Sequence, residues 1–555
     1  MKMRAALVMS LSLLLGSACL AACADENDPK TWVKRLDDPA QRAQALKRLD
    51  EMYQGAMSSA NSNREDPKVK GIIDDADEAL TKVYTTQQLD EKTRKDLIKL
   101  IADMGDPRGA PAFAKAFKDY EPGKNDEDVK FAAQGTSTLS KQNKLTDQGL
   151  IDALWECFSK FKPSQAKSIN LVQDLAGAVK TVKHPTYGAK AAALIQNPIP
   201  DPKSVNDQRD YLQFWQMTSA QLIGDTKYTA GIPALVKVLM TPAKAALTLP
   251  VRTALMKMPK ESEPELIKAL KGEGDYQKLA EGYEARGYMP LVAEPLAYIS
   301  RPPGQAALLE QLAKPDLTPQ NRVLLARDLA HYPPDPKLVA AYKDAYAKTP
   351  GDAAIAAMSG ANAHVLLLEA SANLWDSSLT EWIVKEVNSA KTEPEAHQSG
   401  GLPAAIKLMT NDQSKVVNDA VNKISGPAVE KDKFKSANAV LDKCKKDSAC
   451  YLSFLDTPIP STPDTAKWGH YKAVWMAVEL KDASTKAKLL EKLDKIKDPD
   501  VRLDILLAID ALSPQGDAAA ADKLDKLVAE AEKSGNKAGV DEMYRIALKL
   551  RSRVP

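Results

Sequence analysis

Apolar residues recur at helical intervals along almost the whole chain. The clearest case follows Asp498, where the residues of one apolar face are Val501, Ile505, Leu506, Ile509 and Leu512. Another helix is expected to begin near Asp517. Alternation with a period of two, which is typical of strands, is nowhere longer than chance. The pattern therefore predicts an all-α protein.

The predicted helices form pairs, and the pairs repeat. In residues 104–117 and again in 223–239, a helix ends, a Gly-Asp turn follows, and a second helix opens on Pro-Ala. Pro-Pro turns at 302–303 and 333–334 stand at a similar interval. Intervals of roughly 30 to 47 residues are typical of helical-repeat arrays, in which each pair must stack on its neighbours to bury its apolar face.

Residues 104–117 and 223–239 resemble HEAT repeats, whose second helix begins with a similar Pro-Ala pattern. The resemblance implies a right-handed α-solenoid of antiparallel helix pairs, and the chain length provides for about 11–12 pairs. The Trp, Gly and Tyr pattern of tetratricopeptide repeats is absent. We expect repeats over 32–391 and over 402–555, with the Gly- and Ser-containing stretch 392–401 as a loop or flexion point between them.

The sequence also contains a second repeat with a much longer interval than the helix pairs. At an offset of 260, four proline and aromatic residues recur: Pro198, Pro200, Tyr211 and Trp215 return as Pro458, Pro460, Tyr471 and Trp475. We favour a structural corner used twice, in which Tyr and Trp share a helical face and the Trp is buried beside the Tyr. A paired binding site is the alternative. Both interpretations predict the same helix–loop–helix path in the two copies.

The N-terminus has the features of an export signal. Lys2 and Arg4 precede a short apolar stretch at residues 5–15. This stretch is too short to span a bilayer stably, because about twenty apolar residues are needed. It is therefore predicted to be a removed signal and not an anchor, and no second long apolar run follows it.

Residues 20–23, Leu-Ala-Ala-Cys, resemble the lipobox at which bacterial lipoproteins are cleaved and lipidated. The resemblance implies that residues 1–22 are a removed signal peptide. It also implies that Cys23 carries the lipid, with 23–31 as the anchored linker, so that the protein is held at a membrane of the cell envelope.

Two other cleavage patterns compete with lipidation at Cys23. Cys19 is a second acceptor, although Gly16 stands where the lipobox has a Leu-like residue. Cleavage before Asp25 would instead release a soluble periplasmic protein. Because Ala24 and not Asp follows Cys23, the lipoprotein sorting rule favours the outer membrane, facing the periplasm.

Charge and composition exclude one class of partner. The chain has 76 basic and 74 acidic residues, so it lacks the large positive field that attracts a nucleic-acid backbone. We expect no nucleic-acid binding. The expected partners are other envelope proteins, together with the membrane through the lipid.

No pattern of catalytic or metal-binding residues stands out. The five histidines occur singly, without a second His or Cys at ligand spacing: His184, His331, His364, His397 and His470. A Gly-rich phosphate loop, a nucleophile elbow and a metalloprotease motif are also absent from the sequence. We therefore expect no metal, no cofactor, no catalytic residue and no enzymatic activity.

Cys444 and Cys450 are candidates for a disulfide. Within one helix their side chains would diverge. Lys445-Lys446 followed by Asp447-Ser448, however, indicates that one helix ends and another begins between them. Across such a turn the thiols can meet, and an exported compartment favours oxidation. Two buried thiols are the alternative, and Cys157 is expected to be a core thiol.

Residues 272–303 depart most from the repeat pattern. Four tyrosines lie there among glycines and prolines: Tyr276, Tyr283, Tyr288 and Tyr298. Tyr-rich irregular segments suit contacts with partners, because Tyr offers a large area and a hydrogen bond at low entropic cost. The four residues are therefore candidates for partner binding. A broken repeat without a functional role is the favoured alternative.

These features together predict a non-enzymatic scaffold or adaptor lipoprotein that binds envelope proteins along a helical-repeat surface. An envelope enzyme on a helical superhelix, for example one acting on peptidoglycan, is the first alternative. A structural spacer without a specific partner is the second. A pocket with converging carboxylates would favour the enzyme, and a groove lined by repeat side chains would favour the scaffold.

Overall fold

The computed structural model describes residues 25–199, 206, 208–424, 429–535 and 539–555. The predicted signal peptide, Cys19, Cys23 and Pro200 lie outside these residues. The described chain is all-α, with twenty-nine α-helices, and its strands are a two-residue hairpin, Ala354–Ile355 with Ala361–Asn362. The fold class predicted from the apolar pattern, an α-solenoid, is confirmed.

The chain divides into two compact units, Met1–Leu222 and Ile223–Pro555. In the first unit the helices are α2 (Pro29–Arg35), α3 (Arg42–Ser59), α4 (Pro67–Thr86), α5 (Glu91–Met104), α6 (Ala110–Lys118), α7 (Asp126–Lys141), α8 (Gln148–Lys160), α9 (Ile169–Val182) and α10 (Pro185–Leu194), followed by the π-helix η3 (Gln208–Gln216) and by α12 (Met217–Asp225), which crosses into the second unit.

In the second unit the helices are α13 (Ile232–Leu239), α14 (Thr248–Met256), α15 (Pro259–Lys271), α16 (Gln277–Glu281), α17 (Met289–Ile299), α18 (Pro302–Leu312), α19 (Pro319–Leu329), α20 (Pro336–Ala347), α21 (Ala363–Ala370), α22 (Leu379–Ser389), α23 (Pro394–Leu408), α24 (Ser414–Val421), α25 (Val429–Cys444), α26 (Ser448–Phe454), α27 (Trp468–Glu479), α28 (Thr485–Lys492), α29 (Pro499–Ala511), α30 (Ala518–Lys533) and α31 (Val540–Ser552). Short 3-10 helices are η1 (Pro107–Gly109), η2 (Pro163–Gln165), η4 (Thr229–Gly231), η5 (Pro242–Leu247), η6 (Gly274–Tyr276), η7 (Glu284–Arg286), η8 (Ala356–Met358), η9 (Ser371–Leu374), η10 (Asn411–Gln413) and η11 (Asp464–Lys467).

Many helices begin on an acidic or hydroxyl residue followed by proline. At the start of α4, the Asp66 side chain accepts a hydrogen bond from the Lys68 amide at 2.9 Å. At the start of α29, Asp498 accepts from the amides of Asp500 and Val501, both at 3.1 Å. These side chains accept hydrogen bonds from amides that have no partner within the helix. Proline at the first position lacks an N–H group, but that group would have had no partner within the helix either. The starts of the repeats are thus fixed by local sequence.

In the first unit the helices form two layers. Helices α5, α7 and α9 pack side by side in one layer, and α4, α6 and α8 in the other. The predicted repeat turn is present, because α5 ends at Met104 and Gly105 takes a left-handed conformation with φ of 63°. The phenyl ring of Phe113 on α6 is fully buried between the layers. The Gly-Asp and Pro-Ala pattern therefore marks a true helix pair.

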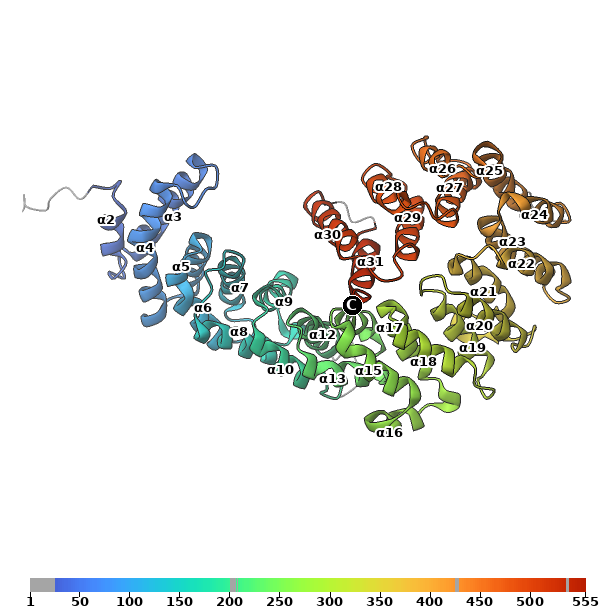
Figure 1. Cartoon of the computed structure of the whole chain (residues 1–555). Helices are drawn as coiled ribbons and strands as arrows, with labels where there is room; N and C mark the ends of the chain where they lie inside the picture. Colours follow the sequence, from blue (N-terminus) through green and yellow to red (C-terminus); the bar gives the residue numbers. More distant parts are fainter. Residues whose placement is uncertain (1–24, 200–205, 207, 425–428, 536–538) are drawn as a thin grey trace, which may run out of the picture. The chain divides into compact units, whose positions relative to one another are not determined.

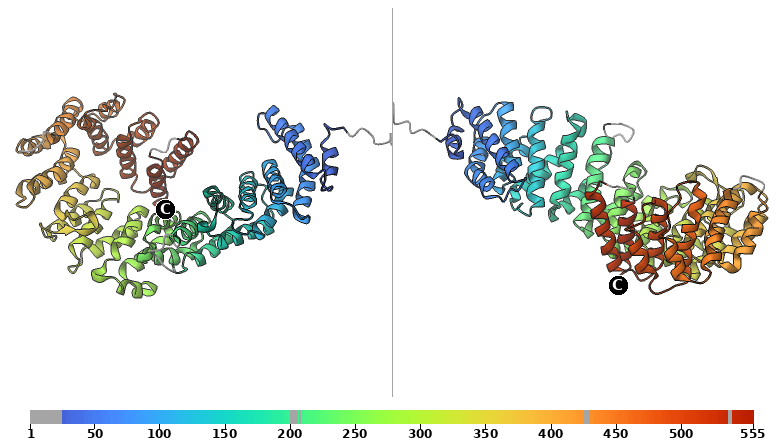
Figure 2. Two further views of the ribbon diagram at one scale, coloured as in Figure 1. Left: turned by 180° about the vertical axis from the view of Figure 1, so that it is seen from behind. Right: turned by 90° about the horizontal axis from the view of Figure 1, so that it is seen from above.

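The second unit closes on itself. Its odd-numbered helices from α17 to α31 contact one another in succession, and α31 packs back against α14 and α17 (Figures 1 and 2). We call these eight helices the inner layer, and their even-numbered partners from α18 to α30 the outer layer. Because α31 meets α17, side chains from both ends of this unit come together.

Two expectations from the sequence require correction. The stretch 392–401 is not a loop, because α23 begins at Pro394 and continues to Leu408. A Cβ on Gly400 would lie 2.8 Å from Val365 Cγ1, and one on Gly401 would lie 2.5 Å from Val387 Cγ2. The glycines thus allow helices to approach closely. The compact units divide within α12 instead.

The second correction concerns the number of repeats. Pairing the described helices in chain order from α3, with α2, α16 and α31 left over, gives thirteen pairs where about 11–12 were expected. Several helices have only eight or nine residues, which accommodates more pairs in the same length. Within the described chain, no helix combines the length and apolar character needed to cross a membrane.

Candidate functional site

The candidate site is a cleft on the inner layer of the second unit, formed by α17, α19 and α21. Local sequence sets each helix start: the Thr318 side chain accepts from the Asn321 amide at 3.2 Å before α19, and Asn362 accepts from the His364 amide at 2.9 Å before α21. The apolar faces of these helices, including Val323 and Leu367, are buried against neighbouring helices. Their remaining faces carry the lining of the cleft.

The cleft has a volume of about 470 Å³, within the range of ligand pockets. Its apolar wall is formed by Pro290, Leu291, Leu324, Leu366 and Ala370. Its polar wall is formed by Glu294, Tyr298, Arg327, Asp328, His331, Glu369 and Asn373. Three successive repeats therefore contribute to one surface.

Tyr298 is the centre of a stacked cluster beside this cleft. Its ring stacks on His331, with 5.2 Å between centroids. The guanidinium carbons of Arg252 and Arg545 lie 4.2 Å and 5.1 Å from the Tyr298 ring centroid. Arg252 belongs to α14 and Arg545 to α31, and Arg252 also forms an ion pair with Glu294. The cluster joins the two ends of the second unit.

The four tyrosines that were candidates for partner binding do not gather at one place. Tyr276 and Tyr288 are core residues with exposed fractions of 1% and 5%, and the Tyr276 hydroxyl donates to Glu265 at 2.8 Å. Tyr283 is half-buried, with its ring edge-on to Tyr288. Tyr298 alone of the four lines the cleft.

The carboxyl groups of the cleft differ in their partners. Glu294 is paired with Arg252, whereas the side chains of Asp328 and Glu369 make no hydrogen bond or ion pair with any described residue. Burial raises the pKa of Asp328 well above its usual value, and the charge of Glu294 raises it further, while Arg327 and Arg252 oppose the rise. Asp328 therefore keeps its proton to higher pH than an ordinary aspartate.

The side chain of His331 is kept neutral. Burial lowers its pKa to about 3, and the charges of Lys549 and Arg545 act in the same direction. At physiological pH the imidazole therefore packs on Tyr298 as an uncharged ring. The Lys549 ammonium donates to the His331 carbonyl oxygen at 2.7 Å, which attaches α31 to the edge of the cleft.

Helix α31 is held in place by a buried ion cluster. Asp510 on α29 pairs with both Lys549 and Arg553. Burial alone would raise the pKa of Asp510, but the two cations outweigh it and hold that pKa below its usual value. Arg553 also donates to the Ser300 hydroxyl at 3.3 Å, directly after α17. Closure of the unit thus rests on polar contacts between its ends.

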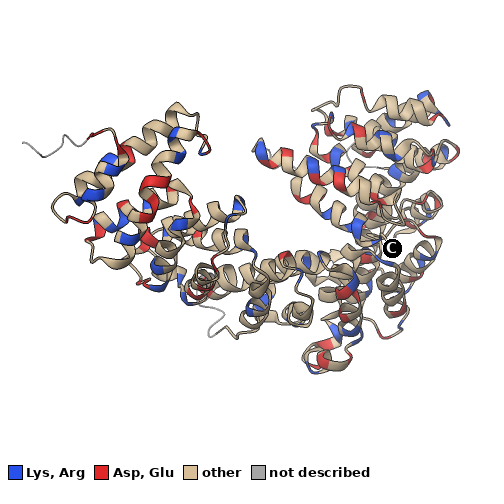
Figure 3. Cartoon of the chain, turned by 60° about the vertical axis from the view of Figure 1, so that its left-hand side comes forward, with Lys and Arg blue, Asp and Glu red and all other residues tan. Residues whose placement is uncertain are grey.

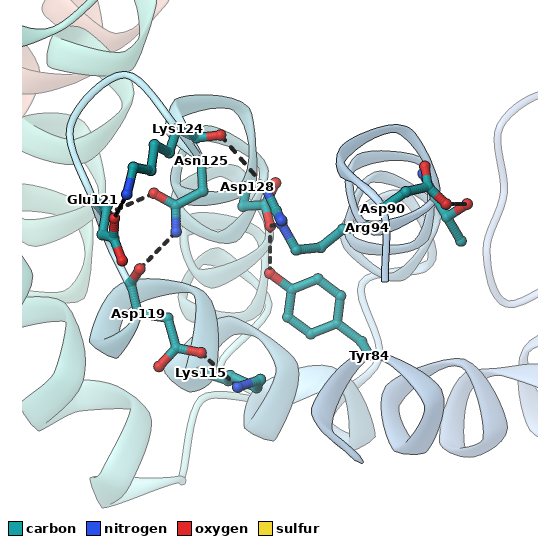
Figure 4. A network of polar contacts seen from close by, with 10 residues as sticks. Tyr84, Asp90, Arg94, Lys115, Asp119, Glu121, Lys124, Asn125 and Asp128 are labelled. Carbon is teal, nitrogen blue, oxygen red and sulfur yellow. Dashed lines mark hydrogen bonds and ion pairs between the residues drawn. The ribbon is translucent and has the colours of Figure 1, made fainter. Parts of the chain in front are cut away.

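A polar network in the first unit has a structural role. The Tyr84 hydroxyl donates to Asp128 Oδ2 at 2.8 Å, and Arg94 pairs with the same carboxylate (Figure 4). Arg94 also donates to the carbonyl oxygen of Lys124 at 3.5 Å. The network ties α4, α5 and α7 together and leaves Asp128 paired. Elsewhere, basic and acidic residues are interspersed along the helices of both units (Figure 3).

The structure places Cys444 and Cys450 across a turn, as the sequence analysis expected. Helix α25 ends at Cys444, Lys445 has a φ of 50°, and α26 begins at Ser448 with Asp447 as its cap. The two cysteines form a disulfide with Cα atoms 5.3 Å apart. Cys157 is buried, and burial raises the pKa of its thiol to about 12, so it remains a protonated core thiol.

Two of the histidines approach each other in space, although the sequence scatters them. The rings of His364 and His397 lie edge to face, 6.3 Å between centroids, and His364 stacks on Tyr346. Across the described ranges, no group of three or more His, Cys, Asp or Glu residues is arranged to hold a metal ion.

The cleft was not predicted from the sequence, yet the chain carries a signal for it. Positions 33 apart on α17 and α19 supply matching parts of the lining: Leu291 with Leu324, Glu294 with Arg327, and Tyr298 with His331. This interval is the repeat length itself. Aligning the two repeats at this interval brings together six of the twelve lining residues, of which Glu294 and Arg327 are charged.

Comparison with known proteins finds no protein-family model and no curated protein that matches this chain. Among solved structures, a chain from a structure of the interaction between cadherin and beta-catenin is 13% identical, with 87% of this chain and 86% of that chain covered and a TM-score of 0.30. Karyopherin Kap121p bound to the extreme C-terminus of the protein phosphatase Cdc14p is 10% identical, with 95% of this chain and 70% of that chain covered and a TM-score of 0.33. The same karyopherin bound to the SUMO protease Ulp1p is 11% identical, with 95% and 78% covered and a TM-score of 0.31. The solenoid assignment rests on the helix order of the chain itself.

Proposed function

We propose that this protein is a non-enzymatic scaffold of a Gram-negative cell envelope, which binds protein partners on the inner layer of its helical repeats. The observation that carries the proposal is the cleft between α17, α19 and α21. Equivalent positions of successive repeats line it, and such surfaces are what repeat arrays offer to extended segments of other proteins. The apolar wall supplies buried area and the polar wall supplies selectivity.

Site-specific photocrosslinking in cells tests this function. A photoreactive amino acid at Leu291, in the cleft, is expected to give a discrete crosslinked product with another envelope protein. The same amino acid at Lys385, on the exposed side of α22 in the outer layer, is the matched control. Equal products from both positions, or none from Leu291, would contradict partner binding at the cleft.

The envelope location is part of the proposal and depends on Cys23. We propose that Cys23 carries the lipid and that the protein faces the periplasm from the outer membrane. Cys23→Ser is expected to abolish incorporation of a fatty-acid probe and to move the protein to the soluble envelope fraction. Cys19→Ser is the control, and loss of label in that variant alone would identify the wrong cleavage site.

An envelope enzyme is the second candidate, and one observation favours it. Asp328 retains its proton to raised pH beside the carboxylates of Glu294 and Glu369, and an acid beside a carboxylate is the arrangement that glycoside hydrolysis uses. The purified protein would then release soluble fragments from dye-labelled peptidoglycan, and Asp328→Asn would abolish the release. If the unmodified protein releases no peptidoglycan fragments, the enzyme candidate fails and the scaffold function remains.

A further inference from the structure

Two carboxyl groups that line the cleft have no ion-pair partner among the described residues. Glu294 is paired with Arg252, but Asp328, which is partly buried, and Glu369, at the open side, have no ion pair with any described residue. The chain supplies partners for comparable groups elsewhere, since Asp510 is held by two cations and Asp128 by one.

The cations near the cleft are engaged with other groups. Arg252 and Arg545 lie against the ring of Tyr298, and Arg252 is neutralised by Glu294. Arg327 is the one cation in the described lining, and its guanidinium donates to the Met358 sulfur at 3.2 Å. Glu369, at an exposed position, offers its charge directly, whereas Asp328 keeps its proton to higher pH when no further cation is near it. A cation bound beside Asp328 would favour its charged form, so binding of a basic side chain is coupled to loss of that proton, and water screens the resulting pair less than a fully solvated one.

The apolar wall of the cleft suits the methylene stem of a basic side chain. Leu324 and Leu366 lie in the same cleft as the two unpaired carboxyls. Lysine and arginine bury their methylene stems on such surfaces while the charged end reaches polar groups. The cleft volume of about 470 Å³ accommodates such a side chain together with a short length of extended chain.

We propose that the cleft receives a lysine or arginine side chain of the bound partner protein, with the charge at Asp328 and Glu369 and the methylenes on Leu324 and Leu366. This inference rests on the proposed partner-binding function and adds the chemical class of the residue that is recognised. Asp77 in the first unit is also unpaired, but it is fully buried and does not line any cleft described above.

The test uses the purified full-length mature protein and a fluorescein-labelled peptide that alternates glycine with lysine. The lysine peptide is expected to bind at least about tenfold more tightly than matched peptides with glutamate or norleucine, and its affinity should fall as salt is added. The double variant Asp328→Asn, Glu369→Gln should weaken its binding about tenfold. Glu381→Gln, at an exposed position of α22, is the control and should bind as the unmodified protein does.

Glu369→Lys provides a variant at an exposed position, where the fold is least affected. It should lose the lysine peptide and gain affinity for the glutamate peptide, because it places a cation where the ligand's charge would lie. Equal binding of the three peptides, or unchanged lysine-peptide binding in both variants, would overturn the inference.

Repeating the Leu291 photocrosslink in the double variant separates this inference from the proposed function. Loss of the crosslink in the double variant, with retention in Glu381→Gln, supports recognition of a basic side chain. A crosslink of full strength in the double variant overturns the inference while leaving partner binding intact. If the unmodified protein gives no crosslink, the proposed function fails, and the peptide titration still decides the inference by itself.

Discussion

The two corners that share residues at an offset of 260 have two helix boundaries in common but different interiors. Helices α10 and α26 end 260 residues apart, at Leu194 and Phe454, and the π-helix η3 and helix α27 begin 260 apart, at Gln208 and Trp468, although α27 directly follows the 3-10 helix η11 (Asp464–Lys467). Trp215 and Trp475 are both buried, with exposed fractions of 6% and 1%, as the duplication predicted. The offset of 260 thus coincides with one helix end, one helix start and the buried indole of both copies, whereas the starts of α10 and α26, Pro185 and Ser448, do not match at this offset.

The interiors differ because different neighbours pack on them. The first copy is a π-helix in which Tyr211 lies edge-on to Trp215, with 4.7 Å between centroids. The second copy is an α-helix in which Tyr471 lies edge-on to Trp468 instead. The expectation of the same aromatic pair in both corners is therefore wrong. The Trp215 indole donates to the Phe158 carbonyl oxygen at 2.9 Å, a contact supplied by α8 of the first unit.

Truncation of the buried indole in each corner is expected to have the largest effect on the free energy of unfolding. Trp215→Ala and Trp475→Ala should each lower the free energy of unfolding by about 3 to 5 kcal/mol, because each leaves a large cavity in a packed repeat. Hydrogen exchange resolved by mass spectrometry should show the loss confined to the repeats around the substituted residue, since neighbours in an array are coupled only locally.

Trp468→Ala is the control for the second corner. Trp468 is half-buried on the same helix as Trp475, so its truncation should cost less than half as much. If Trp475→Ala and Trp468→Ala destabilise the protein equally, the buried indole is not what the two corners share.

The disulfide is a smaller difference between the corners. Cys444 and Cys450 precede the second corner, while the equivalent positions of the first are His184 and Lys190. Cys444→Ala with Cys450→Ala should lower the free energy of unfolding by about 2 kcal/mol, the chain-entropy value for so short a loop. Urea denaturation with and without reductant measures this. Reductant should bring the unmodified protein to the level of the variant, and a variant that still responds to reductant would contradict the assignment.

Sequence reasoning succeeded where the cause is local. The Gly-Asp turn, the Pro-Ala helix start and the acidic caps each depend on a few adjacent residues, so the helix pairs near 104–117 could be predicted. It failed at Gly400 and Gly401, which look like loop residues by composition. Their role depends on Val365 and Val387, side chains of other helices, which lie over the glycine backbone.

The cleft could be predicted only in part for the same reason. The 33-residue interval aligns α17 with α19, but Arg252 and Arg545 reach Tyr298 only because the second unit closes. These two residues lie almost 300 positions apart, and no local pattern brings them together. Tyr276 and Tyr288 were candidates for partner binding, with a broken repeat as the favoured alternative, and both are core residues, since an aromatic side chain in an irregular segment can serve either purpose.

The smallest test concerns one position of the aromatic corners, where the first copy has Leu212 and the second has Lys472. Lys472 is buried, and its ammonium donates to the carbonyl oxygens of Lys407 and Met409 at 2.7 and 2.8 Å. Burial lowers the pKa of Lys472 well below its usual value, and the charge of Lys407 acts in the same direction. An unfolded lysine keeps its proton up to a pH of about 10.4.

Between the lowered folded pKa of Lys472 and that unfolded value, the unfolded state binds more protons, so the free energy of unfolding should rise with pH. Lys472→Leu, which installs the residue of the first corner, should remove this part of the rise. At pH 7 the net change should be small, because the loss of two hydrogen bonds opposes the relief of burying a polar amine. Urea denaturation from pH 7 to 10 measures how steeply the free energy of unfolding rises with pH, with Leu212→Met as the control that keeps the slope of the unmodified protein.

If the free energy of unfolding of Lys472→Leu rises with pH as steeply as that of the unmodified protein, Lys472 does not deprotonate in the folded state. Its two carbonyl partners would then be enough to hold the charge, and the corners would differ in hydrogen bonding alone.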